Sequence, residues 1–207
     1  MKLIDISWPI TENISAYDDK HTVKFDPLLT WKNDKLRKTK LVLDTHTGTH
    51  VDAESHFVED GNTIDVMDLH RVSGKCQVLD LTGVREKIRQ QDLELFTIQE
   101  NDIVLLKTSN SLLDPTAKFN PDFIYLDASA ASYLVKKKVK AVGIDYLGIE
   151  HSQKGHPTHI TLMKQHIPIV EGLRLAHVKP GKYAFICLPL LLVGLEGAPA
   201  RAVLMTI

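Results

Sequence analysis

The chain has 207 residues, and its 25 Lys and Arg residues nearly balance its 26 Asp and Glu residues, leaving a formal net charge of −1. Because nucleic-acid-binding domains concentrate positive charge, this balance gives no electrostatic support for a nucleic-acid partner. The densest basic stretch, Lys136–Lys138 with Lys140, follows an apolar helical pattern and is expected to be the solvated end of a helix. The length suits one domain over residues 1–207, and no repeat or low-complexity segment divides it.

The sequence gives no support for a membrane partner either. Residues 183–195 form the most apolar stretch, which is too short to span a bilayer and contains Pro189. Residues 1–6 lack the long apolar core of a signal peptide, so we expect a cytoplasmic protein. Cys76 and Cys187 each lie in an apolar, strand-like run, which favours buried free thiols over a disulfide.

Apolar and alternating patterns predict more strands than helices, and strand–helix–strand units mainly in the second half of the chain. This order favours a mixed α/β or α+β domain. Two helix starts carry a cap residue, Asp127 and Thr158, and Pro168 is expected to stop the second of these helices. In chain order, the expected strands cover residues 3–10, 36–46, 75–81, 102–108, 139–145, 167–170, 183–190 and 202–207, and the expected helices cover residues 84–90, 128–138 and 159–166.

Four side chains that can bind a metal or move a proton lie within eleven residues: His46, His50, Asp52 and His56. Imidazole nitrogen and carboxylate oxygen are the ligands that zinc and similar divalent ions prefer. The even spacing places all four on one face of an extended chain, whereas a helix would swing Asp52 about 200° away. A straight strand would still separate residues four apart by about 13 Å, too far for ligands of one ion. The chain must therefore bend between His46 and His50, and Gly48 is the residue best able to permit the bend.

This segment alone does not complete a site. His56 is either a fourth ligand or a free acid/base, and a closed site of four protein ligands would be structural rather than catalytic. A second region, residues 150–171, offers His159 at the start of a helix and Glu171 at the end of a short strand. A helix running antiparallel to the strand that follows it would bring these two side chains together. His166, in contrast, is expected at the helix end or facing solvent.

The run His46-Thr47-Gly48-Thr49-His50-Val51-Asp52-Ala53-Glu54-Ser55-His56 resembles a known signature. It is similar to His-x-Gly-Thr-His-x-Asp-Ala-Pro-x-His of the cyclase-like metal-dependent hydrolases, which include bacterial kynurenine formamidases. Only Glu54 departs from the pattern, where the family has proline. The resemblance covers nearly the whole chain, through Asp5-Ile6-Ser7-x-Pro9-Ile10, Ala141-Val142-Gly143-Ile144-Asp145, Glu171-Gly172-Leu173 and Gly197-Ala198-Pro199-Ala200-Arg201-Ala202-Val203.

The resemblance implies a single cyclase-like domain of swivelling β/β/α type, with a mixed sheet and flanking helices, that forms homodimers or homotetramers. It implies one or two divalent ions, usually Zn²⁺ with Mn²⁺ as an alternative, and it places Asp52 between them. His56 would be the catalytic histidine, or one that contacts the metal ligands without binding the ion itself. The metal ligands that it implies are His46, His50, Asp52, His159 and Glu171.

The activity that the resemblance implies is amide hydrolysis by metal-activated water, with N-formyl-L-kynurenine as the leading substrate. The alternatives are a cyclic amide such as isatin, or a non-catalytic member that only binds metal or ligand. Trp8 and Phe57 are expected to bind substrate, with Tyr17 and Trp31 as further aromatic candidates. Glu54 is expected to point to solvent.

Overall fold

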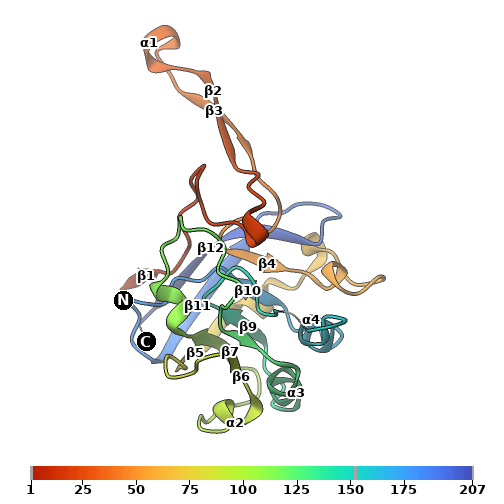
Figure 1. The fold of residues 1–207 in the computed structure, drawn as a ribbon. Coiled ribbons are helices and arrows are strands. Elements are labelled where there is room, and N and C mark those ends of the chain that lie inside the picture. The colour runs from red at the N-terminus through yellow and green to blue at the C-terminus, as the bar shows by residue number, and fades with distance from the viewer. Residues whose placement is uncertain (1, 152, 207) are drawn as a thin grey trace.

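The computed structural model describes residues 2–151 and 153–206, and an eight-stranded mixed sheet forms its centre (Figure 1). The strand order is β1-β12-β11-β5-β7-β9-β10-β4, and β12 also pairs with β4, so the sheet closes on itself. The four neighbours β5, β7, β9 and β10 are parallel, and the remaining pairs are antiparallel. The strands are β1 (Leu3–Asp5), β4 (His50–Asp52), β5 (Ser73–Asp80), β7 (Ile103–Lys107), β9 (Ala141–Ile144), β10 (Ile169–Glu171), β11 (Gly181–Pro189) and β12 (Gly197–Met205).

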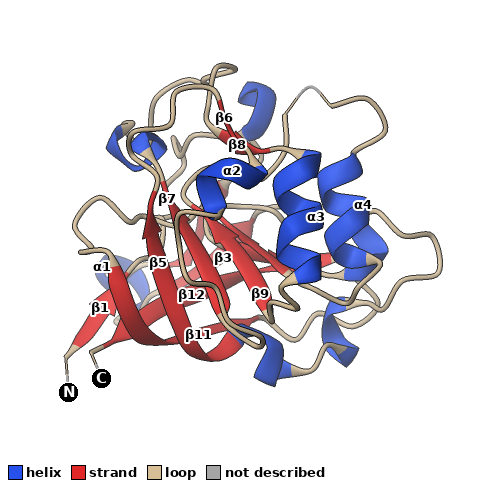
Figure 2. Ribbon diagram, turned by 90° about the horizontal axis from the view of Figure 1, so that it is seen from below, coloured by secondary structure: helices blue, strands red, loops and turns tan. Residues whose placement is uncertain are grey.

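Short elements surround this sheet. Figure 2 shows α3 and α4 side by side on the outside of the parallel strands. The helices are α1 (Trp31–Asp34), α2 (Gln90–Leu93), α3 (Ala128–Lys136) and α4 (Pro157–Met163); the 3-10 turns are η1 (Tyr17–Asp19), η2 (Glu54–His56), η3 (Ile64–Val66), η4 (Leu69–Val72) and η5 (Ser109–Leu112); and two small ribbons pair β2 (Lys24–Leu29) with β3 (Lys38–Val42) and β6 (Lys87–Ile88) with β8 (Tyr125–Leu126).

The parallel strands are buried on both faces, which explains their continuous apolar sequence. Along β7, Val104 and Leu106 join the core between the sheet and the helices. Ile103 and Leu105, which alternate with them, join the core inside the closed sheet with Phe185. Apolar layers therefore pack against both faces of the sheet whose strands carry the candidate site.

Most of the predicted strands are confirmed, as is the helix capped by Asp127, whose carboxylate accepts from the backbone N–H groups of Ser129 and Ala130. The predicted strand over residues 3–10 shortens to β1, and the one over residues 36–46 shortens to β3. The last predicted strand starts earlier, at Gly197, and its final residue, Ile207, lies outside the described residues.

Two helix predictions are wrong. Residues 84–90 do not form a helix, because Lys87–Ile88 pairs with β8 and the helix that follows begins only at Gln90. The N-cap of α4 is His156 rather than Thr158, and Pro157 opens the helix. The Thr158 hydroxyl instead donates to the backbone oxygen of Leu126, which holds the helix against the β6–β8 ribbon. At residues 84–90 and at Thr158, tertiary contacts outweighed the local helix propensity of the sequence.

Of a long hairpin, which we call the arm (residues 24–42), only the second strand, β3, was predicted. The arm consists of β2, α1 and β3, and Figure 1 shows it projecting away from the rest of the molecule. Among the described helices, none has the length and apolar character needed to cross a membrane.

The burial of both cysteines generates a prediction about their reactivity. Cys76 is 3% exposed and Cys187 is fully buried, and burial raises the pKa of the Cys76 thiol to about 12 and that of Cys187 as well. Because the thiolate is the reactive form, we expect a disulfide reagent at pH 8 to label the native protein far more slowly than free cysteine. Both thiols should react at once in guanidinium chloride. Rapid labelling of the native protein would contradict this burial.

Candidate metal centre

Strand pairing brings the two ends of the candidate site together. β4 and β10 are antiparallel neighbours, with His50 opposite Glu171 and Asp52 opposite Ile169. Because side chains alternate along a strand, His50 and Asp52 point to the same face. α4 begins shortly before β10, and its first turn carries His159. The sequence prediction that His159 and Glu171 lie together with the His46–His56 segment is therefore met by the geometry.

The bend before β4 is fixed by glycine. Gly48 has φ +62°, a conformation that favours glycine, and the expected bend between His46 and His50 lies there. Gly172, at φ +67°, packs so closely against Gly48 that a Cβ atom would collide with the Gly48 carbonyl. The Thr49 hydroxyl donates to the Gly172 oxygen at 2.5 Å, which ties the bend to the end of β10.

Two carboxylates link three imidazoles in the site. His50 Nε2 lies 3.4 Å from Asp52 Oδ1 and 3.3 Å from Glu171 Oε2. His46 Nδ1 lies 2.9 Å from Asp52 Oδ1, and His159 Nε2 lies 3.5 Å from Glu171 Oε1. Asp52 thus belongs to two groups of ligand atoms, one with His46 and His56 and one with His50 and Glu171, each within 4.8 Å.

The orphaned atoms of this cluster fit a divalent cation. His46 Nε2, His50 Nε2 and both carboxylate oxygens of Asp52 are buried and make no hydrogen bond of good geometry among the described residues, although His46 Nδ1 lies in ion-pair contact with Asp52 Oδ1. Polar atoms left this way cost free energy, and native structures rarely tolerate several at one place. Nitrogen and carboxylate oxygen donors converging on one point are the donor set of zinc-like ions.

Hydrogen bonds at Nδ1 fix the orientation of two of the imidazole rings. His50 Nδ1 lies 2.9 Å from the Gly48 oxygen, and His159 Nδ1 lies 2.7 Å from Glu150 Oε2. With Nδ1–H donating to these oxygens, Nε2 of each ring is directed at the carboxylates, where it can hold a proton or bind a metal ion as in metal-binding histidines. Sequence reasoning assigned no role to Glu150, because nothing in the spacing marks a residue nine positions before His159 as its partner. Its carboxylate also accepts from the backbone N–H groups of Thr158 and His159.

The carboxylates of the cluster favour protonated imidazoles when no metal ion is bound. Burial lowers the pKa of His46, but Asp52 and its acidic neighbours more than offset this and raise it to about 9. Burial acts the same way on His159, whose pKa Glu150 and Glu171 raise to about 9. Burial opposes ionisation of Asp52, yet His46 and His50 hold its pKa well below the usual range. A bound cation would take the place of these imidazole protons.

His56 lies beside the cluster, on η2. Its ring stacks on that of His46, with centroids 4.1 Å apart. Burial lowers the pKa of His56, although Asp52 opposes this effect. Its imidazole is therefore the one in the cluster that stays neutral near pH 7 and is free to accept a proton.

Glu54 does not point freely to solvent, which corrects the sequence expectation. Its Oε1 lies 2.7 Å from Nδ1 of His166, and it also accepts from the side chain and backbone of Asn62. His166 follows α4 and is largely exposed, as predicted. Glu54 therefore links the segment that carries His56 to the end of the helix that carries His159. This link restrains the segment, as the rigid ring of the family's proline would do at the same position.

A cavity of about 410 Å³ opens onto the cluster. Phe57 and Tyr17 line it as expected, and Phe57 stacks on His159 with centroids 4.2 Å apart. Trp8 is not among its lining residues: it is buried in the core, where its Nε1–H donates to the Pro115 oxygen. Trp31 lies in the arm and is 55% exposed. Neither tryptophan contributes to this cavity, which corrects the substrate-binding expectation for Trp8. The lining also includes Lys20, Asp44 and His156, which sequence reasoning did not select.

Comparison with known proteins places the chain in a family. The family model described as "Putative cyclase" matches residues 4–151. The chain belongs to the cyclase family. Among curated members, kynurenine formamidases of Bacillus cereus and Bacillus anthracis are each 32% identical to it; alignments cover 97% and 98% of this chain and 96% and 97% of those proteins.

Solved structures of similar proteins agree with this placement. A protein described as a potential metal-dependent hydrolase with cyclase activity is 41% identical, with a TM-score of 0.89 over 98% of this chain and 96% of the other. A second protein, described as a predicted metal-dependent hydrolase from Bacillus stearothermophilus, is 41% identical with a TM-score of 0.87, covering 98% and 97% of the two chains. Isatin hydrolase A from Ralstonia solanacearum is 16% identical with a TM-score of 0.84, covering 100% and 92%, and shows the shared fold alone.

The contact between Glu150 and His159 generates a prediction about metal affinity. In Glu150→Gln, the carboxylate that orients His159 loses its charge, and we expect Zn²⁺ affinity to fall by about 10- to 100-fold. Competition with a coloured chelator measures this, and circular dichroism checks the fold. Glu100→Gln, at an exposed glutamate paired with Lys138, is the matched control. Equal affinity in both variants would remove Glu150 from the site.

Proposed function

We propose that this protein is a metal-dependent amide hydrolase that converts N-formyl-L-kynurenine to L-kynurenine and formate, as part of tryptophan catabolism. The observation that carries the proposal is the set of buried ligand atoms, without hydrogen bonds of good geometry, on His46, His50 and Asp52 beside a cavity with an aromatic wall. The full-length similarity to kynurenine formamidases supports this substrate.

The proposed ligands are His46, His50, Asp52, His159 and Glu171, holding one or two Zn²⁺ ions, with Mn²⁺ as the alternative. Two carboxylates and three imidazoles suit such ions, and Asp52 is shared between the two groups of ligand atoms. When bound, a divalent ion polarises the formyl oxygen and lowers the pKa of a coordinated water from 15.7 towards about 7.

The chain's own residues complete the reaction. His56, neutral because burial lowers its pKa, accepts the proton of the attacking water. It returns that proton to the arylamine nitrogen as the carbon–nitrogen bond breaks, so that one amide and one water give one amine and formic acid, which ionises to formate and releases one proton to solvent. Phe57 and Tyr17 offer apolar surface to the aryl ring. Glu150 and the Gly48 carbonyl keep His159 and His50 in their tautomers.

We also propose that the protein acts in the cytoplasm as a homodimer or homotetramer, as the resemblance to the family suggests. Cell fractionation against a cytoplasmic marker tests the location, and sedimentation of the purified protein tests the assembly.

Metal analysis joined to an activity assay tests the proposed function. The purified protein should contain one or two divalent ions for each chain and hydrolyse N-formyl-L-kynurenine. A chelator should abolish activity, and added Zn²⁺ should restore it. Isatin is assayed in parallel: faster turnover of isatin would replace the substrate, and a metal-loaded protein inert towards both would refute the proposed activity.

The position of His56 generates a second prediction. His56→Ala should keep the bound metal near the normal level and lower kcat by about 10²- to 10⁴-fold, the usual contribution of a positioned acid/base. The matched control is His70→Ala, which removes an exposed imidazole on η4. Wild-type turnover in His56→Ala would show that another group carries the proton.

A further inference from the structure

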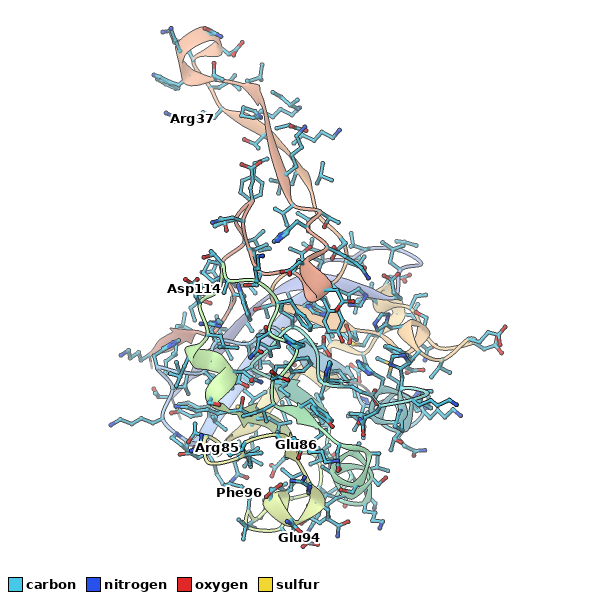
Figure 3. All side chains as sticks on the ribbon, viewed as in Figure 1. Arg37, Arg85, Glu86, Glu94, Phe96 and Asp114 are labelled. Carbon is cyan, nitrogen blue, oxygen red and sulfur yellow. The ribbon has the colours of Figure 1, made fainter. Side chains whose placement is uncertain are left out.

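One lysine lines the cavity beside the candidate metal centre. Among the described residues that form this lining, Lys20 is the only lysine or arginine. Figure 3 shows two other basic side chains, Arg37 and Arg85, at the tip of the arm and on the lower part of the body. The cavity, in contrast, lies at the base of the arm, where Thr22 and Val23 line it. Lys20 is therefore the ammonium group that a molecule in the cavity would meet.

The carboxylates of the lining are already engaged by the protein. Asp44 accepts from the hydroxyl of Thr22 at 2.7 Å. Glu150 and Glu171 accept from backbone N–H groups, and each also pairs with a candidate ligand histidine. The charge of Lys20 is therefore not consumed by an acidic side chain of the cavity wall.

The one ion pair that Lys20 makes within the described chain is weak. Its Nζ lies 3.4 Å from Asp18 Oδ2, and the two side chains are 81% and 50% exposed. Exposed pairs contribute little, because water and salt screen them and two flexible side chains must be ordered. Asp18 is not among the lining residues of the cavity. The ammonium group can therefore exchange Asp18 for an anion that is bound in the cavity.

A strained turn places Lys20 next to the aromatic wall. Lys20 follows η1, and its backbone N–H donates to the Tyr17 oxygen at 3.1 Å. Between them, Asp18 and Asp19 have φ +52° and +56°, which is uncommon for residues other than glycine. The Tyr17 ring packs on Phe119 with centroids 4.6 Å apart, and the Asp19 carboxylate accepts from the Phe119 N–H. Strained backbone persists only where its surroundings impose it, and it clusters at binding sites.

We propose that Lys20 is a specificity-determining residue that binds a carboxylate which the substrate carries away from its scissile amide. The inference rests on the proposed function, which puts the scissile bond at the metal ligands and the aryl ring against Phe57 and Tyr17. Tyr17 and Lys20 belong to one turn, so the cation lies beside the wall that holds the ring. N-formyl-L-kynurenine has such a carboxylate and isatin has none. Lys20 therefore selects anionic amides over neutral ones of similar shape.

Ligand binding to the metal-loaded protein tests this subsite without requiring turnover. Isothermal titration calorimetry compares L-kynurenine with kynuramine, which keeps the aryl ketone and the ammonium group and lacks only the carboxylate. The wild type should bind L-kynurenine more tightly. Lys20→Gln should weaken L-kynurenine binding by about threefold to fivefold, the range of an exposed charge pair, and should leave kynuramine binding unchanged. Lys20→Glu should weaken L-kynurenine binding further, and Lys20→Arg should retain the preference.

The matched control is Lys138→Gln. Lys138 forms a similar exposed pair, with Nζ 3.3 Å from Glu100 Oε1, and it lies outside the cavity lining. This variant should bind both ligands as the wild type does. Raising NaCl from about 0.02 M to about 0.5 M should weaken L-kynurenine binding by the wild type and by Lys138→Gln more than by Lys20→Gln, because salt screens the charge pair.

Two results would overturn the proposal. One is equal affinity of the wild type for the two ligands, or no measurable binding of either. The other is a preference for L-kynurenine that survives in both Lys20→Gln and Lys20→Glu, because the metal ion rather than the lysine would then hold the carboxylate.

Kinetics separate the subsite from the reaction. With N-formyl-L-kynurenine, Lys20→Gln should raise KM about threefold to fivefold and leave kcat nearly unchanged, since the carboxylate is bound equally in the ground state and the transition state. A wild type that binds L-kynurenine through Lys20 and hydrolyses no formamide would refute the proposed function and support the subsite. A wild type that hydrolyses the formamide but binds both ligands equally would refute only the subsite.

Discussion

The juxtaposition of two buried carboxylates is the constraint on which the site depends. Asp52 is fully buried and Glu171 is 4% exposed, they lie on adjacent strands, and each charge raises the cost of ionising the other. Burying like charges is unfavourable unless positive charge compensates them. In the metal-free protein, imidazole protons provide that compensation, and a divalent cation meets the same need with two charges at one point.

The closed sheet explains how the chain holds these groups in place. β4 lies between β10 and β12, so the segment bearing His50 and Asp52 is hydrogen-bonded on both sides. The two glycines packed against each other, Gly48 and Gly172, keep the preceding bend in register with Glu171. His159 comes from outside the sheet, and Glu150 fixes its ring. Rigid elements rather than loops therefore position most of the candidate ligands, as a precise metal site requires.

Local spacing predicted the parts of the site that lie close in sequence. The even positions of His46, His50 and Asp52 and the bend at Gly48 follow from the geometry of an extended chain, which a sequence displays directly. The places of His159 and Glu171 depend on the pairing of strands that lie far apart in sequence. Spacing alone left it open whether these two residues join the site, and the family resemblance decided the prediction. Long-range register is a property of the whole sheet and is not encoded in any short window.

Other features were not predictable because they depend on single tertiary contacts. The role of Glu150 rests on one hydrogen bond to His159, and that of Glu54 on its pairing with His166. Trp8 became a core residue because the Pro115 carbonyl satisfies its indole N–H. In the arm, β3 fell within a predicted strand, whereas β2 combines charged, apolar and proline residues without a clean alternation and carries no strong strand signal.

Anomalous diffraction at the zinc absorption edge, from crystals of Zn²⁺-loaded protein, tests the central claim most directly. We expect one or two strong peaks bounded by Asp52, His50 and Glu171, with His46 or His159 completing the coordination. Stoichiometric zinc with its anomalous peak elsewhere in the molecule, or no peak between these side chains, would contradict it.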